Sequence, residues 1–188
     1  FPSKKWLGFR RLFRASRMWF AHPSISPALL ADRLEDHIRW VSTRPDIHVI
    51  HVLRKDNIEW LKSKFVAKSS NTYWGNPYPI GIKVKIPIRE SIARLKSKEW
   101  IDTRLSNLAD TNPYLSLYYE DFLDNPTNSV HAALSFLQCD PCCVQISDTK
   151  LKRQSKGTAA DYIANYEELI HALRRQDLLV EDIPPLYL

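Results

Sequence analysis

Two short apolar runs restrict the fold of this chain more than any other feature of its sequence. The first, IHVIHVL at 47–53, is rich in β-branched residues, and the second, YLSLYY at 114–119, is rich in aromatic residues. Both have the length and character of buried strands in a parallel sheet. Because segments with helical spacing lie between and around them, the sequence predicts an α/β fold, with a parallel β-sheet flanked by helices.

Helix and strand signals surround these two runs. Asp56 is the expected N-cap of the helix after the first run, with Glu59 as its capping-box partner. IGIKVKI at 80–86 alternates apolar with polar residues, which predicts a further strand. Helices are expected at 28–41, 56–70, 88–109, from Asn125-Pro126 onward, and at 159–176. The helix after Asn125-Pro126 is expected to bury the stripe Val130, Ala133, Leu134 and Leu137.

Composition narrows the class of protein. The chain has 188 residues and is 44% hydrophobic, which fits one domain over 1–188. Its net charge of +6 comes from residues 1–31, which hold six basic residues and no acid; such an arm suits phosphate, a membrane surface or an anionic substrate. No apolar run approaches the ~20 residues of a membrane span. Cys139, Cys142 and Cys143 lack a well-spaced fourth ligand, so we expect no metal, reduced thiols and a cytoplasmic location.

Chemistry-bearing residues follow both expected strands. In parallel sheets ligands collect at the carboxyl ends of the strands, which directs attention to Arg54 and Glu120. A phosphate there would receive a guanidinium fork from Arg54, a hydroxyl from Ser63 and the favourable field of a helix N-terminus. Tyr119 is suited to stack on a base or to hydrogen-bond it. For Glu120 and Asp121 we favour structural roles over acid–base roles, because adjacent side chains point apart.

A third feature is KLKRQSKG at 150–157, with four cations in eight residues before a helix, a plausible phosphate clamp. In order along the chain, IHVLRKDNIEWLKS, LYYEDFLDNP, this basic loop and IANYEEL resemble the sulfotransferases. The chain is most similar to bacterial members that act on carbohydrates and lipids, such as trehalose and nodulation-factor sulfotransferases. LGFR at 7–10, Ala67 and Trp74 also fall in the family's places.

The resemblance implies a P-loop-NTPase-like sulfotransferase fold and 3′-phosphoadenosine 5′-phosphosulfate as the sulfuryl donor. It implies that Arg54 and Ser63 bind the 3′-phosphate and that Tyr119 contacts the adenine. The family's commoner spacing places the cation one residue later, at Lys55, so both registers stay open; Arg54 is preferred because it ends the strand and binds phosphate as a fork. The basic loop would add two further 3′-phosphate ligands, Lys152 and Arg153.

The sequence also departs from the family. The Gly-rich loop that holds the 5′-phosphosulfate has no counterpart, because FPSKKWL at 1–7 contains no Gly. The catalytic residues stay unknown, and His22 is the only early candidate for a base. We therefore expect a domain that lacks its N-terminal strand and this loop. We expect no useful sulfate transfer from these 188 residues alone, but transfer from a form extended upstream of Phe1.

Two other interpretations remain. One is a non-catalytic nucleotide-binding or interaction module of the same fold. The other is a basic nucleic-acid-binding domain that uses residues 4–20 for stacking. A P-loop kinase is disfavoured, because the sequence contains no GxxxxGK[ST]. In the leading interpretation the partner is a hydroxylated acceptor, a carbohydrate, lipid or small molecule, and not a nucleic acid; the sequence leaves the acceptor and the oligomeric state open.

Overall fold

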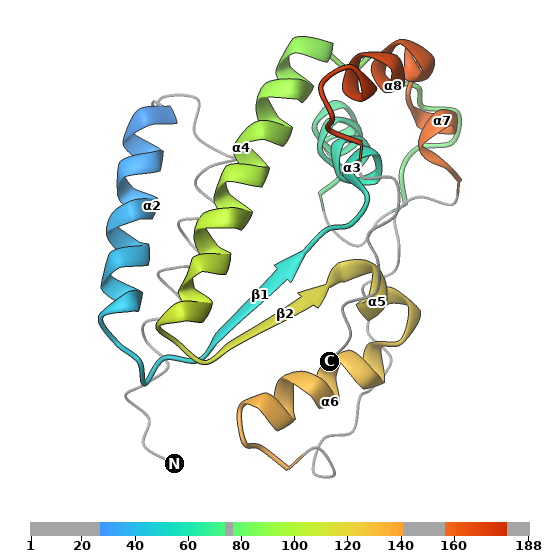
Figure 1. The fold of residues 1–188 in the computed structure, drawn as a ribbon. Coiled ribbons are helices and arrows are strands. Elements are labelled where there is room, and N and C mark those ends of the chain that lie inside the picture. The colour runs from blue at the N-terminus through green and yellow to red at the C-terminus, as the bar shows by residue number, and fades with distance from the viewer. Residues whose placement is uncertain (1–26, 74–76, 141–156, 180–188) are drawn as a thin grey trace. The chain divides into compact units, whose positions relative to one another are not determined.

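The structure, a computed structural model, describes residues 27–73, 77–140 and 157–179 (Figure 1). Its elements in chain order are α2 (Pro27–Ser42), β1 (Val49–Leu53), α3 (Asn57–Ser70), α4 (Ile88–Ser106), the 3-10 helix η1 (Asn107–Asp110), β2 (Tyr114–Tyr118), α5 (Tyr119–Asp124), α6 (Pro126–Phe136), α7 (Ala159–Tyr162) and α8 (Tyr166–Arg174). Within these described ranges, no helix combines the length and apolar character needed to cross a lipid bilayer.

The described residues form two compact units. One comprises residues 27–49 and 104–114, and the other comprises the described residues of 50–103 and 115–179. In the first unit the buried Asn112 amide donates to the carbonyls of Val41, Arg44 and Ile47, at 3.3, 2.8 and 3.2 Å. Because it joins the segment before β1 to the segment before β2, Asn112 fixes where the two strands begin. Whether both units belong to one domain over 1–188 stays a prediction.

β1 and β2 pair in a two-stranded parallel sheet, and Figure 1 shows their arrows side by side and pointing the same way. The Val49 N–H donates to the Pro113 carbonyl at 2.9 Å, which sets the register at the start of the sheet. The connection between the strands contains α3 and α4. The α/β class is thus confirmed as a small parallel sheet with helices around it, and both strands deliver their carboxyl ends to the same edge.

The helix after β1 begins as its sequence predicts. Asp56 is extended and its carboxylate accepts the Glu59 N–H at 2.8 Å, so the N-cap is confirmed. The helix ends at Asn71, whose N–H bonds the Ala67 carbonyl and whose left-handed backbone (φ 53°) turns the next N–H, that of Thr72, onto the same carbonyl at 3.0 Å. Asn tolerates this conformation better than most residues with a side chain. α3 therefore has a defined start directly behind the strand end.

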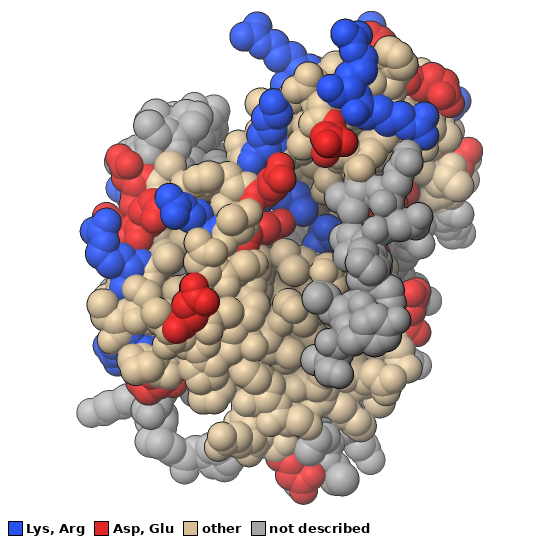
Figure 2. Space-filling model, viewed as in Figure 1, with Lys and Arg blue, Asp and Glu red and all other residues tan. Residues whose placement is uncertain are grey.

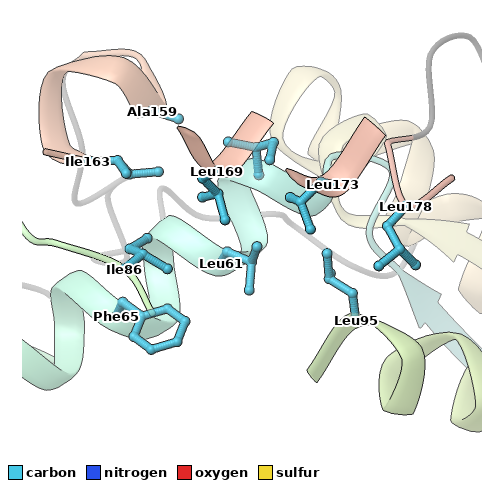
Figure 3. Close-up of a cluster of buried hydrophobic side chains, with 10 residues drawn as sticks. Leu61, Phe65, Ile86, Leu95, Ala159, Ile163, Leu169, Leu173 and Leu178 are labelled. Carbon is cyan, nitrogen blue, oxygen red and sulfur yellow. The ribbon is translucent and has the colours of Figure 1, made fainter. Parts of the chain in front are cut away.

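α3 is held in place by the larger apolar core, drawn in Figure 3. Leu61 from α3, Leu95 from α4 and Leu169 from α8 are each at most 1% exposed. Side chains of this size contribute about 1.5–3 kcal/mol each when fully buried. The cluster consists of Ile58, Leu61, Phe65, Ile86, Leu95, Ala159, Ile163, Leu169, Leu173 and Leu178. It fixes α3, and with it the residues behind the strand end, against α4 and α8.

Two sequence predictions are wrong near this core. Residues 80–86 do not form a strand: Val84 makes a single parallel bridge with Ile163. The helix predicted at 159–176 is broken into α7 and α8, because residues 163–165 turn to meet Val84. There the Asn165 side chain accepts the Ile86 N–H at 2.8 Å and donates to the Ile86 carbonyl at 3.0 Å. The alternating polarity at 80–86 thus accompanies a single bridge, from Val84 to Ile163, which is too short to form a strand of a sheet.

The predicted stripe on α6 is also wrong. Leu137 is 37% exposed and the other three stripe residues are only half-buried, while the buried α6 side chain is Ser129. The start of α6 is confirmed, since the Asn125 side chain caps it by accepting the Asn128 N–H at 3.0 Å. α6 packs against α5, which has six residues and is too short to cover an apolar stripe of three turns.

Candidate anion-binding site

The carboxyl ends of β1 and β2 bring Arg54 and Lys55 next to Tyr119 and Glu120. Tyr119 begins α5 instead of ending the strand, so Glu120 turns back toward β1. One Glu120 oxygen, Oε2, accepts the Lys55 main-chain N–H at 3.1 Å. This hydrogen bond joins residues 65 positions apart in the sequence and locks the two strand ends together. The structure therefore assembles three predicted site residues, Arg54, Lys55 and Tyr119, at one edge.

Arg54 is held by a ring rather than by a carboxylate. Its guanidinium carbon lies 3.5 Å from the centroid of the Tyr119 ring, a close cation–π stack. Its Nη1 is 4.0 Å from Glu120 Oε1, beyond hydrogen-bonding distance. Within the described part of the chain, the guanidinium donates no hydrogen bond, and the side chain is 26% exposed. Arg54 thus presents an oriented cation with unused N–H donors at a partly solvated surface.

Lys55 is differently engaged. Its ammonium lies 2.6 Å from Asp121 Oδ1 and 4.6 Å from the centroid of the Tyr118 ring. Glu120 and Asp121 therefore take structural roles, one at the Lys55 main chain and one at its side chain, as the sequence favoured. An anion that used Lys55 would compete with a close ion pair at 2.6 Å, whereas the ion pair of Arg54 with Glu120 is long, at 4.0 Å.

Ser63 lies on the half-buried side of α3, one turn beyond Glu59. Its hydroxyl donates to the Trp60 carbonyl at 2.8 Å, within its own helix. The Tyr78 hydroxyl reaches the Ser63 carbonyl at 3.4 Å. Burial raises the pKa of Tyr78, and the charge of Arg54 opposes that rise, so Tyr78 lies within electrostatic range of Arg54. Whether the Ser63 hydroxyl is a phosphate ligand beside Arg54 stays a prediction.

Sequence reasoning missed Lys64, which adds positive charge to this neighbourhood. Burial lowers the pKa of its ammonium, and the charges of Arg54 and Arg94 lower it further. The Lys64 ammonium lies 5.7 Å from the Trp60 ring centroid. The only available sequence signal was its position next to Ser63 on α3.

A buried polar network lies behind the strand end. His51 of β1 is 7% exposed, and its Nε2 is 3.3 Å from Asp102 Oδ1. Lys98, one turn earlier on α4, bonds Asp102 Oδ2 at 2.9 Å and donates to the Arg54 carbonyl at 3.4 Å. Burial raises the pKa of Asp102, but the hydrogen bonds from His51 and Lys98 outweigh it and hold that pKa below its usual value. Through Lys98, this network is connected to the main-chain carbonyl of Arg54.

Several predicted features lie outside the described residues. They are the arm at 4–20 with LGFR at 7–10, His22, Trp74, Cys142, Cys143, Lys152 and Arg153. Cys139 is described and exposed. In the ranges that the structure describes, no three His, Cys, Asp or Glu side chains are grouped to hold a metal ion. The expectation of no zinc at 139–143 stays a prediction, since two of its three thiols are not described.

Charges of both signs lie close together on the face shown in Figure 2, where red and blue side chains are interspersed in the upper part of the view. This agrees with the sequence, in which the basic excess belongs to residues 1–31 and the remaining 21 basic residues are matched by 21 acids. The strand-end site is balanced in the same way, because its two cations, Arg54 and Lys55, lie beside the carboxylates of Glu120 and Asp121. Selectivity there must come from which groups have free hydrogen-bonding capacity.

Comparisons of the chain with protein-family models, with curated proteins and with solved structures found no match.

Proposed function

We propose that this chain binds the 3′-phosphate end of 3′-phosphoadenosine 5′-phosphosulfate as part of a sulfotransferase that acts on a hydroxyl of a carbohydrate, lipid or small molecule. The observation that carries the proposal is Arg54, whose guanidinium is stacked on Tyr119 at 3.5 Å and donates no hydrogen bond within the described residues. It stands where two parallel strands end, the place where sheets of this kind bind ligands.

The residues present fit a phosphate group. A guanidinium presents its donors as a planar fork that matches two phosphate oxygens. Ser63 has a hydroxyl that can rotate away from the Trp60 carbonyl. Lys152 and Arg153 remain proposed ligands from the resemblance. The donor would supply the transferable sulfuryl group, and the residues described here would position it.

Calorimetry with two ligands tests the binding half of this proposal. The chain is titrated with adenosine 3′,5′-bisphosphate and separately with AMP, which lacks the 3′-phosphate. We expect the bisphosphate to bind at least about tenfold more tightly, the effect of roughly one charge-assisted hydrogen bond. Equal affinity for both ligands, or no binding of either by chain that circular dichroism shows to be folded, refutes the assignment.

Transfer is tested separately, because binding alone is also what a non-catalytic nucleotide-binding module would show. Labelled sulfate is supplied on the activated donor, with a panel of carbohydrate and lipid hydroxyls as acceptors. Transfer by residues 1–188, or by a form extended upstream of Phe1, supports the enzyme. Tight bisphosphate binding without transfer by either form favours the binding module instead.

A further inference from the structure

One carboxylate oxygen at the strand ends lacks a hydrogen bond. Glu120 Oε1 is buried and finds no donor within the described residues, although its partner oxygen Oε2 accepts the Lys55 N–H at 3.1 Å. A buried acceptor left unpaired costs about 1–3 kcal/mol, so such an atom calls for an explanation. Because Oε2 is anchored by the main chain, Oε1 cannot turn away from the site without breaking that bond.

Two other side-chain oxygens in the described chain share this state, and both differ from Glu120 in their surroundings. Glu35 Oε1 lies 2.9 Å from Arg104 Nε, so a close ion pair already compensates its charge. Asn57 is a neutral amide whose nitrogen donates to the Leu178 carbonyl at 3.0 Å. Glu120 Oε1 has only a long ion pair, 4.0 Å from Arg54 Nη1, and within the described residues neither group makes a hydrogen bond there.

An unused acceptor beside unused donors defines the ligand that fits both. Such a ligand carries an anionic group for Arg54 and, directly next to it, a hydrogen-bond donor for Glu120. A bare phosphate has only the first of these, and Glu120 repels it. In a ribose 3′-phosphate the 2′-hydroxyl is on the carbon adjacent to the phosphate, so one sugar supplies both groups at neighbouring positions.

We propose that Glu120 Oε1 accepts a hydrogen bond from the ribose 2′-hydroxyl of the bound nucleotide, which makes Glu120 a specificity-determining residue for ribonucleoside 3′-phosphates. This inference rests on the proposed function, since it assigns the hydroxyl next to the phosphate that Arg54 holds. It gives Glu120 two separate tasks. Oε2 fixes the strand end through Lys55, and Oε1 selects a ribose over a deoxyribose.

The test compares adenosine 3′,5′-bisphosphate with 2′-deoxyadenosine 3′,5′-bisphosphate by calorimetry on the 188-residue chain. We expect the deoxy ligand to bind about tenfold more weakly to the wild type, the effect of one hydrogen bond to a charged acceptor. The comparison deletes the donor from the ligand and leaves the protein unchanged, so folding plays no part in it. Equal affinities overturn the inference but leave the proposed function standing, whereas binding of neither ligand overturns both.

Glu120→Gln then shows whether Glu120 is the group that recognises the hydroxyl. The amide oxygen still accepts the Lys55 N–H, while an amide nitrogen replaces Oε1. Removing the carboxylate changes affinity for both ligands through charge alone, so the measured quantity is their affinity ratio. We expect that ratio to fall from about tenfold to about threefold or less, because a neutral partner replaces a charged one.

Asp121→Asn is the matched control. It removes the same charge from the adjacent residue, which pairs with the Lys55 ammonium and is 54% exposed. We expect this variant to keep the wild-type ratio. A ratio near tenfold in Glu120→Gln, or an equal fall in both variants, assigns the 2′-hydroxyl to another group and overturns the inference.

Discussion

Exchanging Arg54 and Lys55 separately for alanine tests the central geometry of the site. Two charge-assisted hydrogen bonds from the Arg54 guanidinium are worth about 1.5–3 kcal/mol each, and water recovers part of that when the side chain is removed. We therefore expect Arg54→Ala to weaken binding of adenosine 3′,5′-bisphosphate by about 2–4 kcal/mol, which is roughly 30- to 1,000-fold.

Lys55→Ala has a smaller expected effect because the Lys55 ammonium is already 2.6 Å from Asp121. What the ligand loses is a solvent-screened charge at a distance, worth about 1 kcal/mol or less, and so about fivefold or less in affinity. The main-chain N–H that bonds Glu120 is kept in this variant. The strand end should consequently hold its position.

The assay is isothermal titration calorimetry, with thermal unfolding of each variant as a control for folding. The stack of Arg54 on Tyr119 contributes about 0.5–1 kcal/mol to stability, so Arg54→Ala should remain folded. Arg54→Lys keeps the charge and removes the fork, and its affinity is expected between those of the wild type and Arg54→Ala. A loss in Lys55→Ala equal to or greater than that in Arg54→Ala would show that Lys55 is the phosphate ligand.

Two further predictions concern stability, each measured by urea unfolding. Asn165→Ala leaves the N–H and the carbonyl of Ile86 unpaired and should destabilise by about 2–4 kcal/mol; Asn107→Ala, at an exposed site, is the control, and an equal loss in both would contradict the role of Asn165. The folded-state pKa of Asp102 is lowered, so its ionised form adds to the free energy of unfolding. This contribution is complete above the usual aspartate pKa of about 3.9 and is lost as pH falls through the folded-state pKa. Asp102→Asn should thus lose about 1–3 kcal/mol at neutral pH and lose less than the wild type on acidification, whereas identical pH profiles would refute the linkage.

The sequence predicted those features whose causes are local. The start of α3 follows from Asp56 and the Glu59 N–H three residues on, and both strands follow from short apolar runs. The closeness of Arg54 and Tyr119 follows once the two strands are parallel neighbours. The register between Arg54 and Lys55 was open in the sequence; in the structure the close Asp121 partner of Lys55 and the Tyr119 stack of Arg54 distinguish the two cations.

Features set by distant segments could not be predicted. His51 and Asp102 are 51 positions apart, and nothing in either segment indicates the other. The break between α7 and α8 has the same origin, because the Asn165 side chain bonds Ile86, 79 positions earlier, instead of continuing one helix. A helical apolar pattern runs across 159–176, and tertiary pairing overrides it over three residues.

The way Arg54 is held bears on how strongly it can bind an anion. If its guanidinium were bonded to Glu120 through two hydrogen bonds, a phosphate would have to break them before it gained its own. Instead Glu120 is anchored at the Lys55 N–H, and Arg54 is oriented by the Tyr119 ring, which leaves the edge of the guanidinium open. The Tyr119 ring contacts the face of the guanidinium, whereas hydrogen bonds to a ligand form at its edge, so the ligand need not break the stack in order to bind. The stack already orders the Arg54 side chain, so an anion that binds there costs little further conformational entropy. At Lys55, by contrast, an anion must first displace Asp121 from the ammonium, 2.6 Å away.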